Sequence, residues 1–392
     1  MSNKDSGLTP SGLTPQPPLL QRGGEATPLS REMSCRSNFP LFTREGGARQ
    51  GGGESALSFF PALHTLVWGT ESWEVSAVPG NESVIADGPL AGQPLSAAVA
   101  LWGERLLGRR GMEQGEGGFP LLAKIIDAKD DLSIQVHPNE TLAQQRHHCH
   151  GKTEMWFVLD AQPGASLLAG FSKPLPREEY AARVEDGTIV NYLARHEVHP
   201  GDVFFIPAGR VHAICGGVRV CEIQQSSDIT YRLFDYHRLG LDGKPRQLHV
   251  EEAIDAIDFS VLPEYRTRYE HTPNVPVPIV QCPYFNINLI EATKPMERLL
   301  KNRDSFVLLS LLEGEAVISQ GLTPQPPNTH SPTPSLAKGE EDGLTSQPHF
   351  LQSGRGDFVA KGEVTVLIPA ACADYTIVPV GSGPVRLMET YL

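Results

Sequence analysis

Two pieces of one stretch decide the fold: LSIQVHP at residues 132–138 and GKTEMW at residues 151–156. Gln135 and His137 are two positions apart, and side chains with that spacing point to the same face of a β-strand. Apolar residues alternate with them, so we expect this face to line the inside of a barrel. Glu154 opens a second apolar run after a short polar segment. An amide, an imidazole and a carboxylate are therefore expected to converge from two neighbouring strands.

A second stretch, GDVFFIPAGRVH at residues 201–212, offers one more candidate ligand. Gly201 precedes an apolar strand, Pro207 and Gly209 favour a turn, and His212 begins the next strand. The pattern G-x5-P-x-G-x2-H resembles the second sequence motif of the cupin barrels. The motif is fairly specific, because three residues that shape the backbone and a histidine must all be in place.

Each of these four side chains, considered alone, is most simply a hydrogen-bonded residue of the core or its rim. Considered together, two histidines, one glutamine and one glutamate that face a barrel interior would each need a polar partner. A single divalent metal ion satisfies all four. The sequence therefore predicts a metal site inside a β-barrel.

Composition excludes several classes of partner. The chain has 392 residues and a formal net charge of -13, which argues against nucleic acid but allows a small phosphorylated substrate in a local positive pocket. No apolar run approaches the ~18 residues of a membrane span, and the first residues lack the apolar core of a signal peptide. The six cysteines contain no C-x-x-C pair, so we expect reduced thiols and a cytoplasmic protein.

Two segments look unlike folded domains. Residues 1–56 are rich in Gly, Pro, Ser, Arg and Gln, and their heptapeptide GLTPQPP at 12–18 returns at 321–327 within a second such segment, 320–354. The copies follow no fixed period and have too few apolar residues to bury a core. We expect both segments to be disordered, low-complexity sequence, the second as a loop insert. A Pro-rich docking site for a partner is the alternative interpretation.

Folded sequence is expected in two units. Residues 57–272 hold the candidate ligands and are predicted to form a metal-binding catalytic cupin domain with helical insertions. Residues 273–392 carry further strand patterns, including GEVTVLIPA at 362–370, but the counterpart of His212 falls near Asp374. We therefore expect a mainly β fold of two cupin (jelly-roll) barrels with a few helices, the C-terminal barrel lacking a metal site. Helices are expected at residues 93–107, 176–197 and 250–258.

Four segments together resemble the mannose-6-phosphate isomerases of the cupin superfamily, most of all their short bacterial form: residues 132–138, 151–156, 201–213 and 222–232. The resemblance covers about residues 57–319 and 355–392. It implies one zinc ion per chain, and the implied ligands are Gln135, His137, Glu154 and His212.

The resemblance also implies an activity: mannose 6-phosphate and fructose 6-phosphate interconvert through a cis-enediolate, as a proton moves between C1 and C2. Arg232 matches the catalytic arginine of the family and would add a fixed positive charge beside the zinc. Lys152 matches a position with an acid–base role, and Glu222, on the strand that leads to Arg232, is an equally ranked proton carrier. Two further residues match positions assigned to the substrate phosphate, namely Lys124 and Ser133.

Other classes of cupin remain open at this point. A non-haem iron oxygenase would use two histidines and one carboxylate with open positions, and metal analysis would separate it from an isomerase. A non-catalytic cupin that binds sugar phosphates would fail an isomerase assay. A phosphoglucose-specific cupin isomerase is the nearest alternative within the enzyme class.

Overall fold

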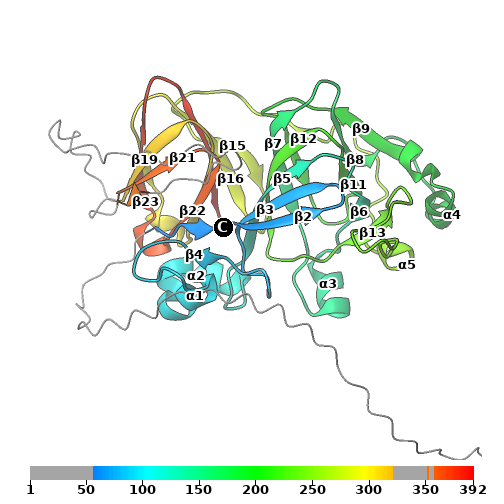
Figure 1. The fold of residues 1–392 in the computed structure, drawn as a ribbon, viewed down its shortest axis with the longest axis horizontal. Coiled ribbons are helices and arrows are strands. Elements are labelled where there is room, and N and C mark those ends of the chain that lie inside the picture. The colour runs from blue at the N-terminus through cyan, green and yellow to red at the C-terminus, as the bar shows by residue number, and fades with distance from the viewer. Residues whose placement is uncertain (1–55, 321–350, 353–356) are drawn as a thin grey trace, which may run out of the picture. The chain divides into compact units, whose positions relative to one another are not determined.

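The computed structural model describes residues 56–320, 351–352 and 357–392, which lie within one compact unit of the chain. The predicted low-complexity segments, 1–56 and 320–354, lie outside these ranges except at their edges. The described chain is mainly β, as the sequence predicts, and forms four antiparallel sheets of five or seven strands (Figure 1). The short strands β1 (Phe59–Phe60) and β4 (Val84–Ile85) form a separate two-stranded sheet.

Two of these sheets come from the first half of the folded chain. The seven-stranded sheet has the order β14 (Arg266–Thr267), β10 (Val203–Ile206), β7 (Glu154–Ala161), β12 (Val218–Gln225), β5 (Leu121–Ala128), β3 (Gly69–Val75) and β2 (Ala62–Leu66). The five-stranded sheet has the order β13 (Tyr231–Phe234), β6 (Ile134–Val136), β11 (His212–Ile214), β8 (Ser166–Phe171) and β9 (Leu193–Glu197).

The two sheets share an apolar core. Trp156 and Phe204 of the seven-stranded sheet pack in one cluster with Leu167 and Ile214 of the five-stranded sheet. Such packing of two antiparallel sheets through their inner faces is the arrangement of a jelly roll. The candidate ligands lie on strands of both sheets, so the sandwich itself brings them together.

The other two sheets come from the second half of the folded chain. One five-stranded sheet has the order β15 (Val277–Gln281), β16 (Asn286–Ala292), β24 (Val385–Tyr391), β18 (Val307–Glu313) and β22 (Val364–Ile368). The other has the order β17 (Met296–Leu299), β23 (Asp374–Pro379), β19 (Glu315–Gln320), β21 (Asp357–Lys361) and β20 (Leu351–Gln352). They enclose a core of their own that includes Ile290, Ile318 and Tyr375. A further core cluster joins the two halves, because Val75 and Ile223 pack in it with residues such as Met388.

The helices of the described chain are short. They are α1 (Leu95–Trp102), α2 (Glu104–Gln114), α3 (Glu140–His147), α4 (Tyr180–Glu185) and α5 (Val250–Ala253), with 3-10 turns η1 (Arg177–Glu179), η2 (Thr188–Tyr192), η3 (Lys301–Arg303) and η4 (Ala370–Cys372). Gly103 has a φ of 47° and separates α1 from α2, where the sequence predicted one helix.

The helix predicted over 176–197 was wrong as one continuous element, because only residues 177–185 and 188–192 are helical and residues 193–197 form a strand. Gly187, with a φ of 73°, follows the end of α4, and the chain continues as a 3-10 turn and then as strand β9. Ile189 and Leu193 are buried like helix-face residues, but one belongs to the turn and the other to the strand. Apolar spacing of about four residues was therefore produced by three successive elements.

Candidate metal centre

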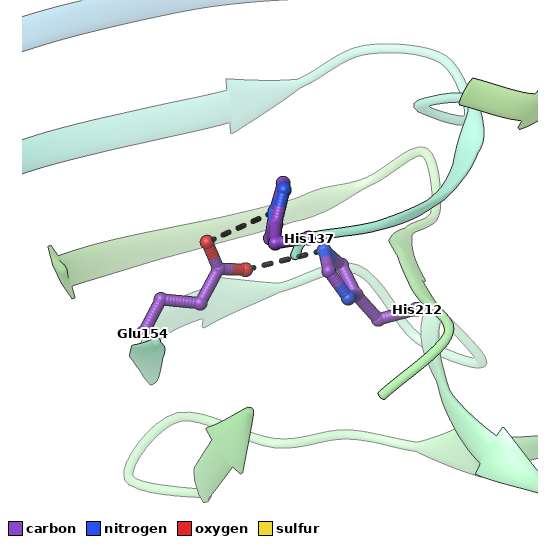
Figure 2. Close-up of side chains that lie close together, drawn as sticks. All are labelled: His137, Glu154 and His212. Atoms are coloured by element: carbon purple, nitrogen blue, oxygen red, sulfur yellow. Dashed lines mark ion pairs between the residues drawn. The ribbon is translucent and has the colours of Figure 1, made fainter. Parts of the chain in front are cut away.

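Three predicted ligands meet in the interior of the first barrel (Figure 2). Glu154 is the first residue of β7, His212 is the first residue of β11, and His137 directly follows β6. Glu154 Oε2 lies 3.3 Å from His137 Nε2, and Glu154 Oε1 lies 3.2 Å from His212 Nε2. Candidate ligand atoms of all three lie within 4.8 Å of one another, and all three side chains are buried.

Gln135 belongs to the same group. It is the cross-strand neighbour of His212 in the pairing of β6 with β11, and its amide nitrogen lies 3.3 Å from His212 Nε2. Which end of an amide faces a partner follows from its hydrogen bonds, so the oxygen can turn to this position when a cation is its partner. The four ligands predicted from the sequence therefore form one cluster.

Backbone carbonyls fix both imidazoles. His137 Nδ1 lies 2.9 Å from the carbonyl of Ile229, and His212 Nδ1 lies 2.8 Å from the carbonyl of Arg210. A carbonyl only accepts, so each Nδ1 must carry the proton and each Nε2 must present a lone pair to Glu154. Burial lowers the pKa of His137 to about 3 and also lowers the pKa of His212. Both rings are therefore neutral, which is the form that binds metals.

These donors fit a divalent cation. Glu154 Oε1 is buried and has no hydrogen-bond partner, although His212 Nε2 is close to it, because neither atom carries a proton. Lys152 Nζ contacts Glu154 Oε2 and lies 3.0 Å from His137 Nε2. Burial raises the pKa of Glu154, but Lys152 and the two neighbouring histidines together outweigh it and hold that pKa well below its usual range. Lys152 therefore compensates part of the cluster, and Glu154 Oε1 and His212 Nε2 keep lone pairs that a bound cation would satisfy.

A cavity of about 280 Å³ adjoins the cluster. Gln135 and Lys152 line it and also contact the cluster, so the two features form a single site. The other predicted site residues that line the cavity are Lys124, Ser133, Glu222 and Arg232. The structure therefore brings all nine residues singled out from the sequence into the cluster or the wall of this cavity.

One wall of the cavity carries carboxylates around a lysine. Lys124 Nζ lies 3.3 Å from Glu71 Oε2 and 3.6 Å from Glu222 Oε1. Trp156 Nε1 donates to Glu222 Oε2 at 2.7 Å. Burial, followed by repulsion from the Glu154 carboxylate, raises the pKa of Glu222. The carboxyl group of Glu222 is therefore easier to protonate than an exposed glutamate.

Another part of the cavity wall carries two arginines, one on the smaller sheet and one in the irregular segment after it. Arg232 is the cross-strand neighbour of Gln135, its Nε donates to Ser133 Oγ at 3.2 Å, and its Nη1 donates to the carbonyl of Gln247 at 2.9 Å. Arg246 lines the same cavity.

Sequence reasoning missed Arg246 and Glu71 as members of the site. Glu71 had a usable signal, because it lies two positions before Trp73 on a strand and therefore on the same face. Arg246 had no such signal, because it lies in an irregular segment where no strand or helix periodicity predicts the direction of its side chain.

The fold and the cluster define a two-barrel β protein of the cupin type with one buried group of metal-ligand side chains. The family model of the phosphomannose isomerase type I catalytic domain matches residues 57–156. Mannose-6-phosphate isomerase ManA of Bacillus subtilis is 35% identical over 68% of this chain and 88% of its own length. Mannose-6-phosphate isomerase of Streptococcus mutans is 33% identical over 64% of this chain and 78% of its own length.

Solved structures agree with these relatives. The crystal structure of mannose 6-phosphate isomerase from Bacillus subtilis superimposes with a TM-score of 0.67 at 26% identity, covering 86% of this chain and 100% of that one. A variant of phosphomannose isomerase from Salmonella typhimurium has the same fold, with a TM-score of 0.62 at 16% identity over 86% of this chain and 99% of that one. The chain belongs to the mannose-6-phosphate isomerase family and is an isomerase.

None of the helices within the described ranges is long and apolar enough to cross a membrane. Four cysteines within those ranges are free thiols: Cys149, Cys215, Cys221 and Cys282.

Proposed function

We propose that the chain interconverts mannose 6-phosphate and fructose 6-phosphate, with one zinc ion per chain and through a cis-enediolate. One observation carries the proposal: two neutral imidazoles, a carboxylate and an amide converge beside a cavity that also presents Arg232, Lys152 and Glu222. Family membership supplies the reaction class and the substrate, which the relatives carry in their names.

The proposed ligands of the zinc ion are Gln135, His137, Glu154 and His212. Imidazole and carboxylate are common zinc ligands, and the hydrogen bonds from both Nδ1 atoms hold the rings in the required orientation. Bound zinc would act as a Lewis acid and would stabilise negative charge on the oxygens of C1 and C2. With one carboxylate among four ligands, little of that Lewis acidity is neutralised by the protein.

The remaining chemistry belongs to side chains of the cavity. Arg232 keeps its charge at every relevant pH, so it can stabilise the developing enediolate as a fixed donor. Glu222 and Lys152 are the two candidate carriers of the proton between C1 and C2. Burial and the nearby Glu154 raise the pKa of Glu222, which brings it closer to the neutral range that suits a general base.

Ser133 and Lys124 are proposed to bind the substrate phosphate. Ser133 accepts a hydrogen bond from Arg232 and lies beside a positive group. Lys124 lies between two carboxylates, so its charge is largely compensated. That position also gives Lys124 a second role, which is to orient Glu222.

Residues 57–272 are proposed to act as the catalytic domain and residues 273–392 as a second cupin domain that supports it. We propose that the enzyme works in the cytoplasm, and the free cysteines support this. Its substrate is a small phosphosugar, and the net charge of -13 disfavours a nucleic-acid partner.

Chelation tests the proposal directly. Purified protein should isomerise mannose 6-phosphate, lose this activity after treatment with a chelator, and regain it when about one equivalent of zinc per chain is added. Isomerisation and zinc content are measured on the same samples. Full activity in chelated, metal-free protein would contradict the metal assignment. Bound iron with oxygen consumption in place of isomerisation would identify an oxygenase.

A further inference from the structure

Two arginines bind one buried carboxylate at the edge of the cavity. Asp235 directly follows β13, the strand that carries Arg232, and is only 5% exposed. Arg246 donates to it from Nε at 2.7 Å and from Nη2 at 2.5 Å. Arg238 donates to the same carboxylate from Nε at 2.9 Å and from Nη2 at 2.8 Å. One negative charge therefore faces two guanidinium groups.

Arg232 adds a third positive charge without a carboxylate of its own. The hydrogen-bond partners of its guanidinium in the described part of the chain are the hydroxyl of Ser133 and the carbonyl of Gln247, both of which are neutral. Burial lowers the pKa of Arg232, and repulsion from Arg246 lowers it further. A guanidinium does not lose its proton in a protein, so a bound anion is what can relieve this excess of charge.

Only one of the two arginines on Asp235 reaches the cavity. Arg246 lines it together with Arg232 and Ser133, whereas Arg238 is not part of its wall. Asp235 occupies the Nε–Nη2 edge of Arg246, and Nη1 has no partner among the described residues. Asp228 also lines the cavity but forms no ion pair with either arginine there. The free N–H groups of Arg246 are therefore available to an anion in the cavity.

The cavity's other positive groups are already engaged. Lys124 lies between two glutamates, and Lys152 contacts Glu154 of the metal cluster. Arg232 neighbours Gln135, so the arginines continue the wall directly from the row of metal ligands. A single ligand could therefore place an anionic group at the arginines and its other end at the cluster of His137, Glu154 and His212.

We infer that Arg246 binds the phosphate group of the substrate beside Arg232 and Ser133, with Asp235 as the positioning residue that holds its guanidinium in the cavity wall. This inference rests on the proposed function; it keeps Ser133 as a phosphate contact and makes Arg246, in place of the compensated Lys124, the main positive contact. A guanidinium whose one edge is fixed by a carboxylate loses little entropy when the remaining N–H groups bind phosphate oxygens.

The test compares Arg246→Met with Arg238→Met. Both variants remove one guanidinium from Asp235, but only the first removes a group from the cavity wall. Loss of a charge-assisted hydrogen bond should raise the KM for mannose 6-phosphate roughly ten- to a hundredfold in Arg246→Met, with a smaller fall in kcat. The inhibition constant of inorganic phosphate should rise by a similar factor. Arg238→Met should change both constants by less than about threefold.

Two results would overturn the inference. One is an unchanged KM and unchanged phosphate inhibition in Arg246→Met; the other is an equal loss in Arg238→Met, which would make the cluster around Asp235 structural. If Arg246→Met does not fold by circular dichroism, Arg246→Lys is measured instead. Lysine keeps the positive charge but lacks the paired N–H donors of a guanidinium, so the KM of Arg246→Lys should lie between that of the parent and the value expected for Arg246→Met.

The design also separates this inference from the proposed function. Should the zinc-loaded parent protein fail to isomerise mannose 6-phosphate, calorimetric titration with inorganic phosphate still compares the parent with Arg246→Met and Arg238→Met. Tighter binding by the parent and Arg238→Met than by Arg246→Met supports the anion site, even with a different reaction. Equal binding by all three proteins contradicts it.

Discussion

At the scale of single residues, the two imidazoles of the cluster show why these side chains suit a metal. The carbonyls of Ile229 and Arg210 fix the proton on each Nδ1, and burial keeps both rings neutral. His137 and His212 thus present lone pairs in an interior where an unpaired polar atom is costly. A cation bound here would replace the missing protons, and we expect it to stabilise this arrangement.

His137→Ala should therefore empty the site of metal. Removal of a direct ligand should weaken zinc binding by more than the roughly 10–100-fold that loss of a supporting residue costs. Zinc per chain, measured by elemental analysis after dialysis, should fall far below that of the parent. His196→Ala is the matched control, because His196 lies in the same barrel and is bonded to the carbonyl of Ala169 but is not one of the clustered side chains. Full zinc content in His137→Ala would remove this residue from the ligand set.

Glu222→Gln distinguishes the two proposed proton carriers. If Glu222 is the base, kcat should fall about 10²–10⁴-fold while zinc is retained. Its raised pKa also sets the direction of the pH profile: only the ionised form accepts a proton, so activity should rise with pH through a value above that of an ordinary glutamate. The profile of kcat against pH measures this. Near-normal kcat in Glu222→Gln, with a large loss in Lys152→Met, would assign the step to Lys152.

At the scale of elements, the turn between β10 and β11 connects the backbone to the metal cluster. Gly209, in the turn that the motif predicted, has a φ of 92°, and its N–H donates to the carbonyl of His137 at 2.9 Å. Its own carbonyl accepts from the N–H of Asp258 at 2.8 Å. A Cβ at this position would lie 3.0 Å from the carbonyl oxygen of Ala256. The turn thus anchors a ligand-bearing strand on one side and the segment after α5 on the other.

Gly209→Ala should lower both stability and zinc affinity. Left-handed backbone at a non-glycine residue costs about 1–3 kcal/mol, and contact with Ala256 adds to that cost. Gly164→Ala is the control, because Gly164 has a φ of 77° but a Cβ there would meet no atom within 4 Å, so only the backbone strain applies. Thermal midpoints and zinc titrations of both variants provide the comparison. Equal effects in the two variants would show that the turn has no special connection to the metal site.

The secondary-structure elements also show which features of the fold could be predicted from the sequence. Strands with alternating patterns and the turn of Pro207 and Gly209 could be predicted, because a period of two and a positive φ depend on local chemistry alone. The extent of the helix predicted over 176–197 could not, because apolar spacing does not reveal where Gly187 redirects the chain. Arg246 likewise enters the site only through Asp235, a contact that no periodic pattern encodes.

At the scale of the whole described unit, the two barrels are joined by more than an apolar core. Strand β3 of the first barrel contacts β22 of the second. Arg219 of β12 forms an ion pair with Glu363, which directly precedes β22. Glu74 of β3 lies nearby and is buried, and it accepts a hydrogen bond from Ser72 at 2.6 Å. Burial, reinforced by the charge of Glu363, raises the pKa of Glu74 to about 7.

This carboxyl group should make stability depend on pH. Its pKa is about 7 in the folded chain, against 4.5 for an ordinary glutamate, so the folded state holds the proton more tightly. The resulting stability is fully present below about pH 4.5 and is lost as pH rises through 7, a difference of roughly 3 kcal/mol. Glu74→Gln mimics the protonated form, so it should raise the thermal midpoint at pH 8 but not at pH 5. The exposed Glu297→Gln should show no such difference, and an equal response of the two variants at both pH values would mean that Glu74 is ionised in the folded protein without penalty.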